Sequence, residues 1–402
     1  MIGIGVAGAG YWGPKHIRIF GELPGSHVAM VADLSEERLA GIRAQHRTIH
    51  TTNHFEDLLQ SGDVDAVVIA TPVSTHGQLA RQALLAGKHV LVEKPLAATS
   101  REAGDLVTLA ATHNRVLAVG HTFLYSPAVL MLRDLVTSGE IGEVYYAHSQ
   151  RLNLGLFQRD INVLWDLAPH DLSILFYVLG MEPDAVAAHG CAHFDAGIED
   201  VAYMALEFPN NVTASVHVSW LDPNKVRRLT LVGTKKMVVY DDVETPEKIR
   251  VYDKGIDLPP GEKQFGGFQF SYRYGGVTIP VVPGDEPLRL QGEHFLSCIQ
   301  SGSLPRSDGT QGLKVVQALE AAGASLARGG VMVPLPTAKR TGDAGTQQLK
   351  PLPNLDAVTV VEEPAVHHDR SSNGVSGHTG NESRTMVAAR NGTGGERDHV
   401  LQ

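Results

Sequence analysis

Short apolar runs alternate with amphipathic stretches through the first 120 residues of the chain. The runs predict strands, and apolar positions spaced three to four residues apart between them predict helices. The predicted strands cover residues 2–7, 28–32, 66–70, 89–92 and 116–119, and the predicted helices lie near 13–20, 36–45, 55–60, 77–86 and 100–114. Strands that alternate with helices are typical of parallel β-α-β units, so we expect a doubly wound parallel sheet.

The pattern changes after a predicted helix near residues 127–137. Successive strands separated by turn residues are then predicted over 144–152, 186–192, 202–208, 212–220, 227–233, 236–240 and 249–252. One helix, from about residue 166 to 179, interrupts them, and two more follow near 288–300 and 309–328. Consecutive strands with hairpin-like turns indicate a mostly antiparallel sheet. The sequence therefore predicts an α/β protein with a large, mostly antiparallel sheet in its second half.

These patterns divide the chain into three segments. We expect a dinucleotide-binding domain over residues 1–122 and a domain for substrate binding and oligomerisation over 123–335. Residues 336–402 contain no Phe, Tyr or Trp and are rich in Gly, Ser, Thr, Asn and Pro. Such a segment cannot bury enough apolar surface to offset a backbone ordering entropy of about 1–2 kcal/mol per residue, so we predict a mostly disordered tail.

The first predicted strand leads directly into the motif G-x-G-x-x-G at residues 8–13. The first glycine permits a tight turn, the second lets the backbone approach a pyrophosphate, and the third allows close packing of helix on strand. The helix that opens there directs free N–H groups and its positive dipole end at the phosphates. An acid follows the next strand, twenty residues beyond the last glycine. The predicted cofactor-binding residues of this segment are Gly8, Gly10, Tyr11, Trp12, Gly13 and Asp33.

Asp33 also bears on which dinucleotide binds. Its carboxylate is placed to accept hydrogen bonds from the adenosine ribose and would repel the 2′-phosphate of NADP. NADP sites usually supply an arginine at or just after this position, whereas here Arg38 comes farther along the next predicted helix. The sequence favours NAD over NADP.

Composition and charge set limits on the partners. Hydrophobic residues make up 43% of the 402 residues and charged residues 19%, as in an ordinary globular protein. The net charge of −10, with no basic stripe, argues against nucleic acid as a partner. No run approaches the roughly 20 apolar residues that cross a bilayer, and no cleavable leader is recognisable. The two cysteines, without metal-ligand spacing, predict a cytoplasmic protein with no metal.

Two further candidate groups follow predicted strands of the first sheet. Thr71 and Pro72 come directly after the third strand, and Ser74 or Thr75 could cap the helix that carries His76. Glu93, Lys94 and Pro95 end the fourth strand. Because the carboxyl ends of strands face the ligand crevice in an open α/β sheet, we expect Lys94 to project into it and to hydrogen-bond a substrate hydroxyl. A plain strand–turn–helix connection explains His76 equally well. The predicted cofactor-binding residues here are Thr71, Pro72, His76, Glu93 and Lys94.

A third group lies at the start of the helix predicted from residue 166. Asp166 and His170 are four residues apart and would share a face of that helix. Because proline is costly inside a helix, Pro169 predicts that this is the first turn. Asp166 could then orient His170 as a general base. A capping aspartate beside a packed core histidine would give the same pattern, so both interpretations stay open.

Taken together, these motifs resemble the glucose–fructose oxidoreductase/inositol dehydrogenase (Gfo/Idh/MocA) family. The glycine motif, Thr71-Pro72 with His76, the E-K-P element at 93–95 and D-x-x-x-H at 166–170 occur in the family's order and approximate spacing, over roughly residues 1–330. The resemblance implies a Rossmann domain followed by an α/β domain whose open sheet commonly forms subunit interfaces, and hence a homodimer or homotetramer. It also implies a cis Lys94–Pro95 bond, with Lys94 and His170 at the reacting carbon.

The chain departs from many family members before Asp166 and after the fifth strand, so a substrate cannot be transferred from the inositol or free-sugar members. The pattern is most similar to members that oxidise the 3-hydroxyl of a nucleotide-linked sugar. Basic and polar residues in the second segment are candidate diphosphate contacts, and aromatic ones are candidate contacts to sugar or base, although each alone suits a structural role equally. The predicted substrate-binding residues are Tyr125, Arg151, Arg159, Asn162, Trp165, Lys225 and Arg227, with Trp220 as a further stacking candidate.

The expected activity is therefore hydride transfer between NAD and a sugar carbon. His170, oriented by Asp166, would remove the hydroxyl proton while Lys94 stabilises the alkoxide. A keto-sugar nucleotide reductase or an inositol or free-sugar dehydrogenase would use the same residues. An NAD-dependent glycosidase or a non-catalytic NAD-binding sensor, both hosted by the same fold, are alternatives of another class.

Overall fold

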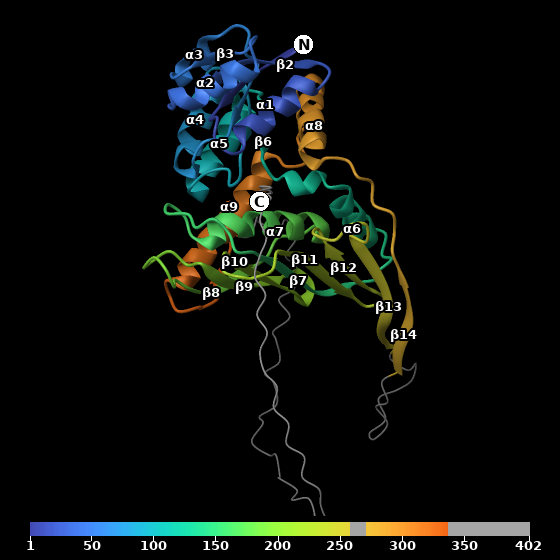
Figure 1. The fold of residues 1–402 in the computed structure, drawn as a ribbon. Coiled ribbons are helices and arrows are strands. Elements are labelled where there is room, and N and C mark those ends of the chain that lie inside the picture. The colour runs from blue at the N-terminus through green and yellow to red at the C-terminus, as the bar shows by residue number, and fades with distance from the viewer. Residues whose placement is uncertain (258–270, 337–402) are drawn as a thin grey trace, which may run out of the picture. The chain divides into compact units, whose positions relative to one another are not determined.

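The computed structural model describes residues 1–257 and 271–336, which belong to a compact unit spanning Met1–Ala338 (Figure 1). They form two sheets, one of six strands and one of nine. Nearly all of the predicted tail lies outside the described residues. No helix in the described part of the chain is long and apolar enough to cross a membrane.

The six-stranded sheet is parallel throughout, with the order β3-β2-β1-β4-β5-β6. Its strands are β1 (Ile2–Ala7), β2 (Ser26–Ala32), β3 (His50–Thr52), β4 (Ala66–Ile69), β5 (His89–Val92) and β6 (Leu117–Val119). The helices between them are α1 (Gly13–Glu22), α2 (Glu36–Gln45), α3 (Phe55–Gln60), α4 (Val73–Leu85) and α5 (Ser100–Thr112). The predicted doubly wound sheet is confirmed. Strand β3 was missed because its three polar residues, one exposed and two half-buried at a sheet edge, carry no apolar pattern.

Both faces of this sheet are buried. Alternate residues of β4 show it, since Val68 packs with Ile17 and Phe20 of α1, whereas Val67 packs with Ala80 of α4 and Leu106 of α5. A parallel sheet covered on both faces is expected to have such continuously apolar strands. With both faces covered, the carboxyl ends of the strands are where a ligand is expected to bind.

The nine-stranded sheet has the order β14-β13-β12-β11-β7-β10-β9-β8-β15. Its strands are β7 (Val144–Leu152), β8 (Ala185–Cys191), β9 (Val201–Phe208), β10 (Val212–Ser219), β11 (Val226–Gly233), β12 (Met237–Asp241), β13 (Ile249–Asp257), β14 (Ser271–Thr278) and β15 (Val333–Pro334). All pairs are antiparallel except β7 with β10, so the prediction of a mostly antiparallel sheet is confirmed. Strand β14 was missed because it is exposed and contains Gly275-Gly276.

Helices cover one face of this second sheet. The remaining helices are α6 (Pro127–Thr137), α7 (Val163–Leu179), α8 (Pro287–Ser301) and α9 (Gly309–Leu326), with short 3-10 turns η1 (Thr122–Tyr125) and η2 (Pro209–Asn211). Helix α7 lies along β7, β9 and β10 and ends at Gly180 in the left-handed conformation (Figure 1). Helix α9 packs against both α5 and α7. Helix α9 thus connects α5, which covers the first sheet, with α7, which covers the second. As a result, α7 lies at the carboxyl ends of the strands of the first sheet.

Candidate active site

The glycine loop after β1 has the geometry of a phosphate cradle. Gly8 has φ +95°, and a Cβ there would lie 2.6 Å from the carbonyl oxygen of Ala70. A Cβ on Gly13 would lie 2.0 Å from the carbonyl oxygen of Gly8. At Gly10, by contrast, the nearest atom to a Cβ is a guanidinium nitrogen of Arg38, 3.9 Å away. Two glycines are therefore required by the fold, and the third leaves open space where a pyrophosphate fits above the start of α1.

Asp33 lies at the ribose end of the cradle. Its Oδ2 accepts a hydrogen bond from the backbone N–H of Ala9 at 2.6 Å, and its Oδ1 accepts one from Ser35 at 2.7 Å. Arg38, in the first turn of α2, reaches back to within 3.6 Å of the same Oδ2. Sequence spacing did not suggest that contact. The acid after β2 thus binds the backbone of the glycine loop and has an arginine beside it.

His76 joins two of the strand-end loops. Its Nδ1 lies 2.8 Å from the carbonyl oxygen of Pro95, and its Nε2 lies 2.8 Å from that of Thr71. Burial lowers the pKa of this imidazole. Helix α4 begins at Val73 with Pro72 as its N-cap and without a side-chain cap. The expected cap by Ser74 or Thr75 is therefore wrong: the hydroxyl of Thr75 bonds to the carbonyl of Pro72 and to the hydroxyl of Thr71 instead.

Glu93 is buried and faces α1. Its Oε1 lies 2.7 Å from Nε2 of His16, which is also buried, and its Oε2 accepts from the backbone N–H of Lys94. Burial alone would raise the pKa of Glu93, but the hydrogen bond and charge of His16 together with the charge and backbone N–H of Lys94 outweigh it, and the net pKa is lowered. Glu93 is thus held as a carboxylate at the end of β5. His16 was not singled out in the sequence, although it stands three residues after Gly13.

Lys94 reaches across to α7. The Lys94–Pro95 bond is cis, as the family resemblance implied. The ammonium donates to the backbone carbonyl of Asp166 at 2.7 Å and to its Oδ1 at 3.3 Å, while the side chain is 13% exposed. The carboxyl end of β5 and the first half of α7 therefore meet at one point.

Helix α7 corrects two expectations. It begins at Val163, with Asn162 as the N-cap accepting from the N–H of Trp165, so Pro169 lies inside the helix and not in its first turn. The carboxylate of Asp166 accepts from Nε1 of Trp220 at 2.9 Å and from Lys94, and no hydrogen bond of the described residues joins it to His170. The two carboxylate oxygens of Asp166 thus bind Lys94 and Trp220, so Asp166 positions the lysine and not His170.

His170 lies one helical turn beyond Asp166. It is partly exposed, but its Nδ1 is buried and has no hydrogen-bond partner within the described ranges. The ring of Phe123 meets the imidazole edge to face, with centroids 5.1 Å apart. Burial lowers the pKa of His170 well below its usual value, and the positive charges of Lys94 and Arg151 lower it further. The imidazole is consequently neutral near pH 7 and can accept a proton.

Cationic side chains border the aromatic ring of Phe123. Arg151 forms a buried ion pair with Asp171 at 2.7 Å, and its guanidinium lies 4.7 Å from the ring centroid. Arg227 lies 5.9 Å from the same centroid and 3.5 Å from Asp242. Lys225 precedes it on the same segment, and burial lowers the pKa of both side chains. Two guanidinium groups therefore flank the ring that packs against His170.

The other predicted substrate contacts lie elsewhere or have partners. Tyr125 is buried, with its hydroxyl 3.0 Å from that of Ser307, so a contact with sugar is not supported. The amide of Asn162 binds Glu199 besides capping α7. Trp220 is buried as well, which leaves its ring no room to stack on a base. Arg159 is exposed in the loop before α7, and Trp165 is half-buried between the two domain cores.

In the glycine loop, Tyr11 and Trp12 contact each other and the ammonium of Lys15. Tyr11 is 46% exposed. Both aromatic rings stay available to a cofactor in that loop.

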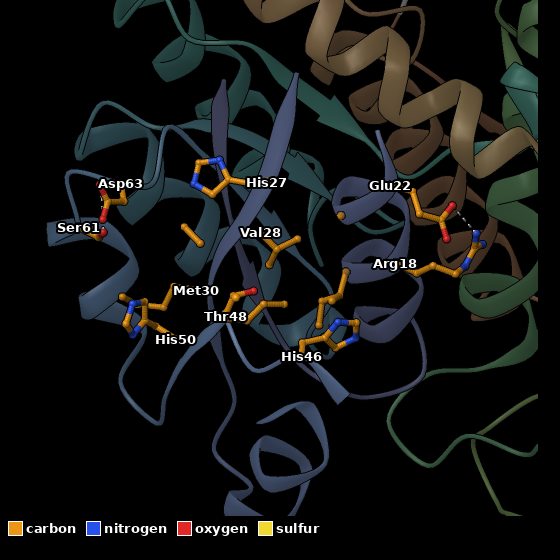
Figure 2. A pocket seen from close by; sticks show the side chains of 14 residues that line it. Arg18, Glu22, His27, Val28, Met30, His46, Thr48, His50, Ser61 and Asp63 are labelled. Atoms are coloured by element: carbon orange, nitrogen blue, oxygen red, sulfur yellow. Dashed lines mark hydrogen bonds and ion pairs between the residues drawn. The ribbon is translucent and has the colours of Figure 1, made fainter. Parts of the chain in front are cut away.

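A separate hollow of about 640 Å³ lies at the other end of the first sheet (Figure 2). Its lining includes His27 and Val28 at the start of β2, His46 and His50 before and on β3, and Asp63 before β4. These are the amino ends of the strands, whereas the glycine loop, Asp33 and Lys94 follow the carboxyl ends. None of the predicted site residues lines the hollow. Within the described ranges, no group of three or more His, Cys, Asp or Glu side chains is placed to hold a metal ion.

Comparison with known proteins bears on both halves of the chain. The model of the oxidoreductase family with an NAD-binding Rossmann fold matches residues 2–121, and the model of the GFO/IDH/MocA C-terminal domain matches residues 129–239. The first sheet is thus an NAD-binding Rossmann fold, as predicted.

Three relatives illustrate the range of the similarity. UDP-N-acetylglucosamine 3-dehydrogenase from Acidithiobacillus ferrooxidans is 31% identical over 64% of this chain and 79% of its own length. Its solved structure matches with a TM-score of 0.67 at 28% identity, covering 81% of this chain and 98% of that one. Inositol 2-dehydrogenase 2 from Saccharopolyspora erythraea is 33% identical over 54% of this chain and 66% of its own length. GenD2 from gentamicin A biosynthesis, solved in complex with NAD, gives a TM-score of 0.70 at 25% identity, covering 84% and 97%.

Proposed function

Because the chain belongs to the Gfo/Idh/MocA family of NAD-binding oxidoreductases, we propose that it oxidises the 3-hydroxyl of a nucleotide-linked sugar, with an amino sugar as the first candidate. The observation that carries the proposal is the meeting of Lys94 with Asp166, one helical turn before the neutral imidazole of His170. An ammonium from the cofactor domain and a base from the second domain can act there on one oxygen.

The reaction needs a proton acceptor and a hydride acceptor. NAD, when bound, supplies the second by taking the hydride from the sugar carbon. Nδ1 of His170 is buried, so Nε2 is the nitrogen that accepts the hydroxyl proton. Lys94 donates a hydrogen bond to the same oxygen and stabilises the developing negative charge. Asp166 holds the ammonium at that point, and the indole N–H of Trp220 holds the carboxylate of Asp166. The products are a keto sugar, reduced cofactor and a proton on His170. A reductase would run the same steps in reverse.

The nucleotide part of the substrate is inferred from charge. Arg227 lies beside Phe123, and Phe123 lies against His170, so a cation stands one aromatic ring away from the proposed base. Its partner Asp242 lies 3.5 Å away and also pairs with Lys248, so one carboxylate is shared between two cations. A sugar held by its 3-hydroxyl at His170 places an anomeric phosphate a few ångströms farther on. The relative that acts on UDP-N-acetylglucosamine supports the same substrate class.

The test is a screen of nucleotide sugars, free sugars and inositols with NAD, following the absorbance of reduced nicotinamide. We expect turnover with a nucleotide sugar and formation of its 3-keto product, identified by mass and NMR. Arg227→Met should raise KM for the nucleotide sugar about tenfold and leave the Kd for NAD unchanged. Turnover of free sugars or inositols alone would overturn the substrate proposal while leaving the oxidoreductase chemistry intact.

We also infer that two or four copies of the chain assemble through the second sheet. Along β9, Ala202, Met204 and Leu206 face the helices, whereas Tyr203 is 53% exposed on the other face. Tyr146 of β7 is exposed on the same face as Tyr203, and no helix of the described residues covers that face (Figure 1). Sedimentation should show a dimer or tetramer that Tyr203→Glu dissociates. A monomeric wild-type protein would contradict this.

A further inference from the structure

His121 is the buried polar side chain that the mechanism leaves unexplained. It follows β6 directly and is fully buried, yet neither ring nitrogen has a hydrogen-bond partner in the described part of the chain. Buried polar groups in native proteins are nearly always paired, and an unpaired one costs about 1–3 kcal/mol. A neutral imidazole has one donor and one acceptor to satisfy. Its burial therefore calls for a hydrogen-bond partner close by.

The same region holds another unmatched nitrogen. Within residues 1–257 and 271–336, four buried side-chain nitrogens lack a partner; two belong to His121, one is Nδ1 of His170, and one is Nε of Arg115. His121 begins η1, which packs against α7, and Phe123 of η1 touches the ring of His170. Three of the four unmatched nitrogens therefore lie at one junction.

We propose that a hydrogen bond across one water joins His121 to His170 and makes His121 the positioning residue for the base. In this arrangement the Nδ1–H of His170 donates toward an unprotonated nitrogen of His121. The Nε2 lone pair of His170 is then free for the substrate hydroxyl. The inference rests on the proposed function in one respect, namely that His170 is the base.

The charges around His121 fit this direction of donation. Burial lowers the pKa of His121 to about 4, so the ring is neutral near pH 7 and keeps one lone pair. At the end of the neighbouring strand β5, the charges of Glu93 and Lys94 act on this pKa in opposite directions, so burial decides it. Without this acceptor, His170 would be free to carry its proton on Nε2, where it could not act as a base.

The decisive experiment measures the tautomer of His170 without any substrate. In ¹⁵N-histidine-labelled protein near neutral pH, long-range nitrogen–proton spectra distinguish an Nδ1–H from an Nε2–H ring. We expect Nδ1–H for His170 in the wild type and a shift toward Nε2–H in His121→Phe. His121→Asn and His121→Gln place an amide near Nδ1 or Nε2 of the lost ring, and one of them should restore Nδ1–H. His46→Phe, at the amino ends of the strands, should leave the tautomer unchanged.

A kinetic arm follows once a substrate is known. His121→Phe should lower kcat at least tenfold with KM within about threefold of wild type, and the restoring amide variant should recover part of kcat. An Nε2–H ring in the wild type, or an Nδ1–H ring that persists in His121→Phe, would overturn the inference. Because the spectra need no turnover, they decide it even if the nucleotide-sugar screen fails. If His121→Phe does not fold, the two amide variants carry the same test.

Discussion

The two ends of the site are built in different ways. At the cofactor end, the backbone sets the shape: Gly8 and Gly13 have no space for a Cβ, and both oxygens of Asp33 are bound to main-chain N–H groups. At the reacting end, side chains from three elements converge: Lys94 after β5, His121 after β6, and Asp166 with His170 on α7. There, buried nitrogens lack partners among the described residues.

The residues that the fold needs are therefore mostly different from the residues that we expect to act in the reaction. The cofactor end is a satisfied structure whose glycines are needed for the fold itself. At the reacting end, buried ring nitrogens have no hydrogen-bond partner among the described residues, which is expected where proton positions must change during turnover. Mutations at the first end should therefore alter folding or binding, and mutations at the second should alter rate.

The largest effect is expected at Lys94. Lys94→Met should lower kcat by about 1,000-fold because the developing alkoxide loses its cationic donor, while the Kd for NAD stays within about threefold. Steady-state kinetics and a titration with NAD measure the two quantities. Lys88→Met is the matched control, since Lys88 binds the carbonyls of Ser61 and Val64 at the other end of the sheet. Near-wild-type kcat in Lys94→Met would remove the lysine from the mechanism.

The next effect compares two glycines of one loop. Gly13→Ala should lower the free energy of unfolding by roughly 3 kcal/mol, because its Cβ would meet the carbonyl of Gly8. Gly10→Ala has no such clash, so it should fold normally and weaken NAD binding about tenfold. Denaturant unfolding and NAD titration of both variants test this. Equal stability of the two would contradict the assignment of Gly10 to the cofactor and Gly13 to the fold.

Acid should destabilise the reacting end. The pKa of His121 is lowered to about 4, so between about pH 6.5 and 4 the unfolded chain binds a proton that the folded chain does not. Stability is thus full above about pH 6.5 and falls as the pH drops toward 4, by on the order of 3 kcal/mol from this residue. Unfolding free energies at several pH values should fall less steeply in His121→Phe. Parallel curves for the two proteins would argue against a neutral buried His121.

The smallest effect concerns the choice of dinucleotide. Asp33→Asn removes the charge that repels a 2′-phosphate and leaves Arg38 in place, 3.6 Å from that side chain. We expect the preference for NAD over NADP to fall about tenfold, measured as the ratio of the two Kd values. The double variant Asp33→Asn/Arg38→Met should bind NADP little better than the wild type does, because it lacks the cation that would pair with the 2′-phosphate. An unchanged ratio in the single variant would contradict the ribose assignment.

The same contrast explains what the sequence could predict. The glycine loop and the alternating strands depend on local spacing, so both sheets were predicted correctly. Edge strands β3 and β14 were missed because exposed edge residues need no apolar alternation. The start of α7 was misplaced because Pro169 was expected to mark a first helical turn, whereas the helix begins at Val163 and continues through the proline.

Side-chain pairings were harder to predict. Asp166 was expected to orient His170, but Lys94 and Trp220 come from distant segments and take both of its oxygens. Tyr125 was placed at the sugar, although its hydroxyl has a buried partner in Ser307, nearly two hundred positions away in sequence. The His16–Glu93 pair and the buried His121 likewise arise from contacts between strands that no local pattern encodes.

The central claim is that Lys94 and His170, from different domains, act on the same oxygen. A double-mutant cycle on kcat tests it directly, with Lys94→Met, His170→Asn and the two combined, each checked for folding and NAD binding. When two groups act together on one oxygen, removing the second costs little once the first is gone. The kcat of the double variant should therefore be no more than about tenfold below that of the slower single variant. Losses that multiply in full would mean that the two residues act at separate places, and the account would be wrong.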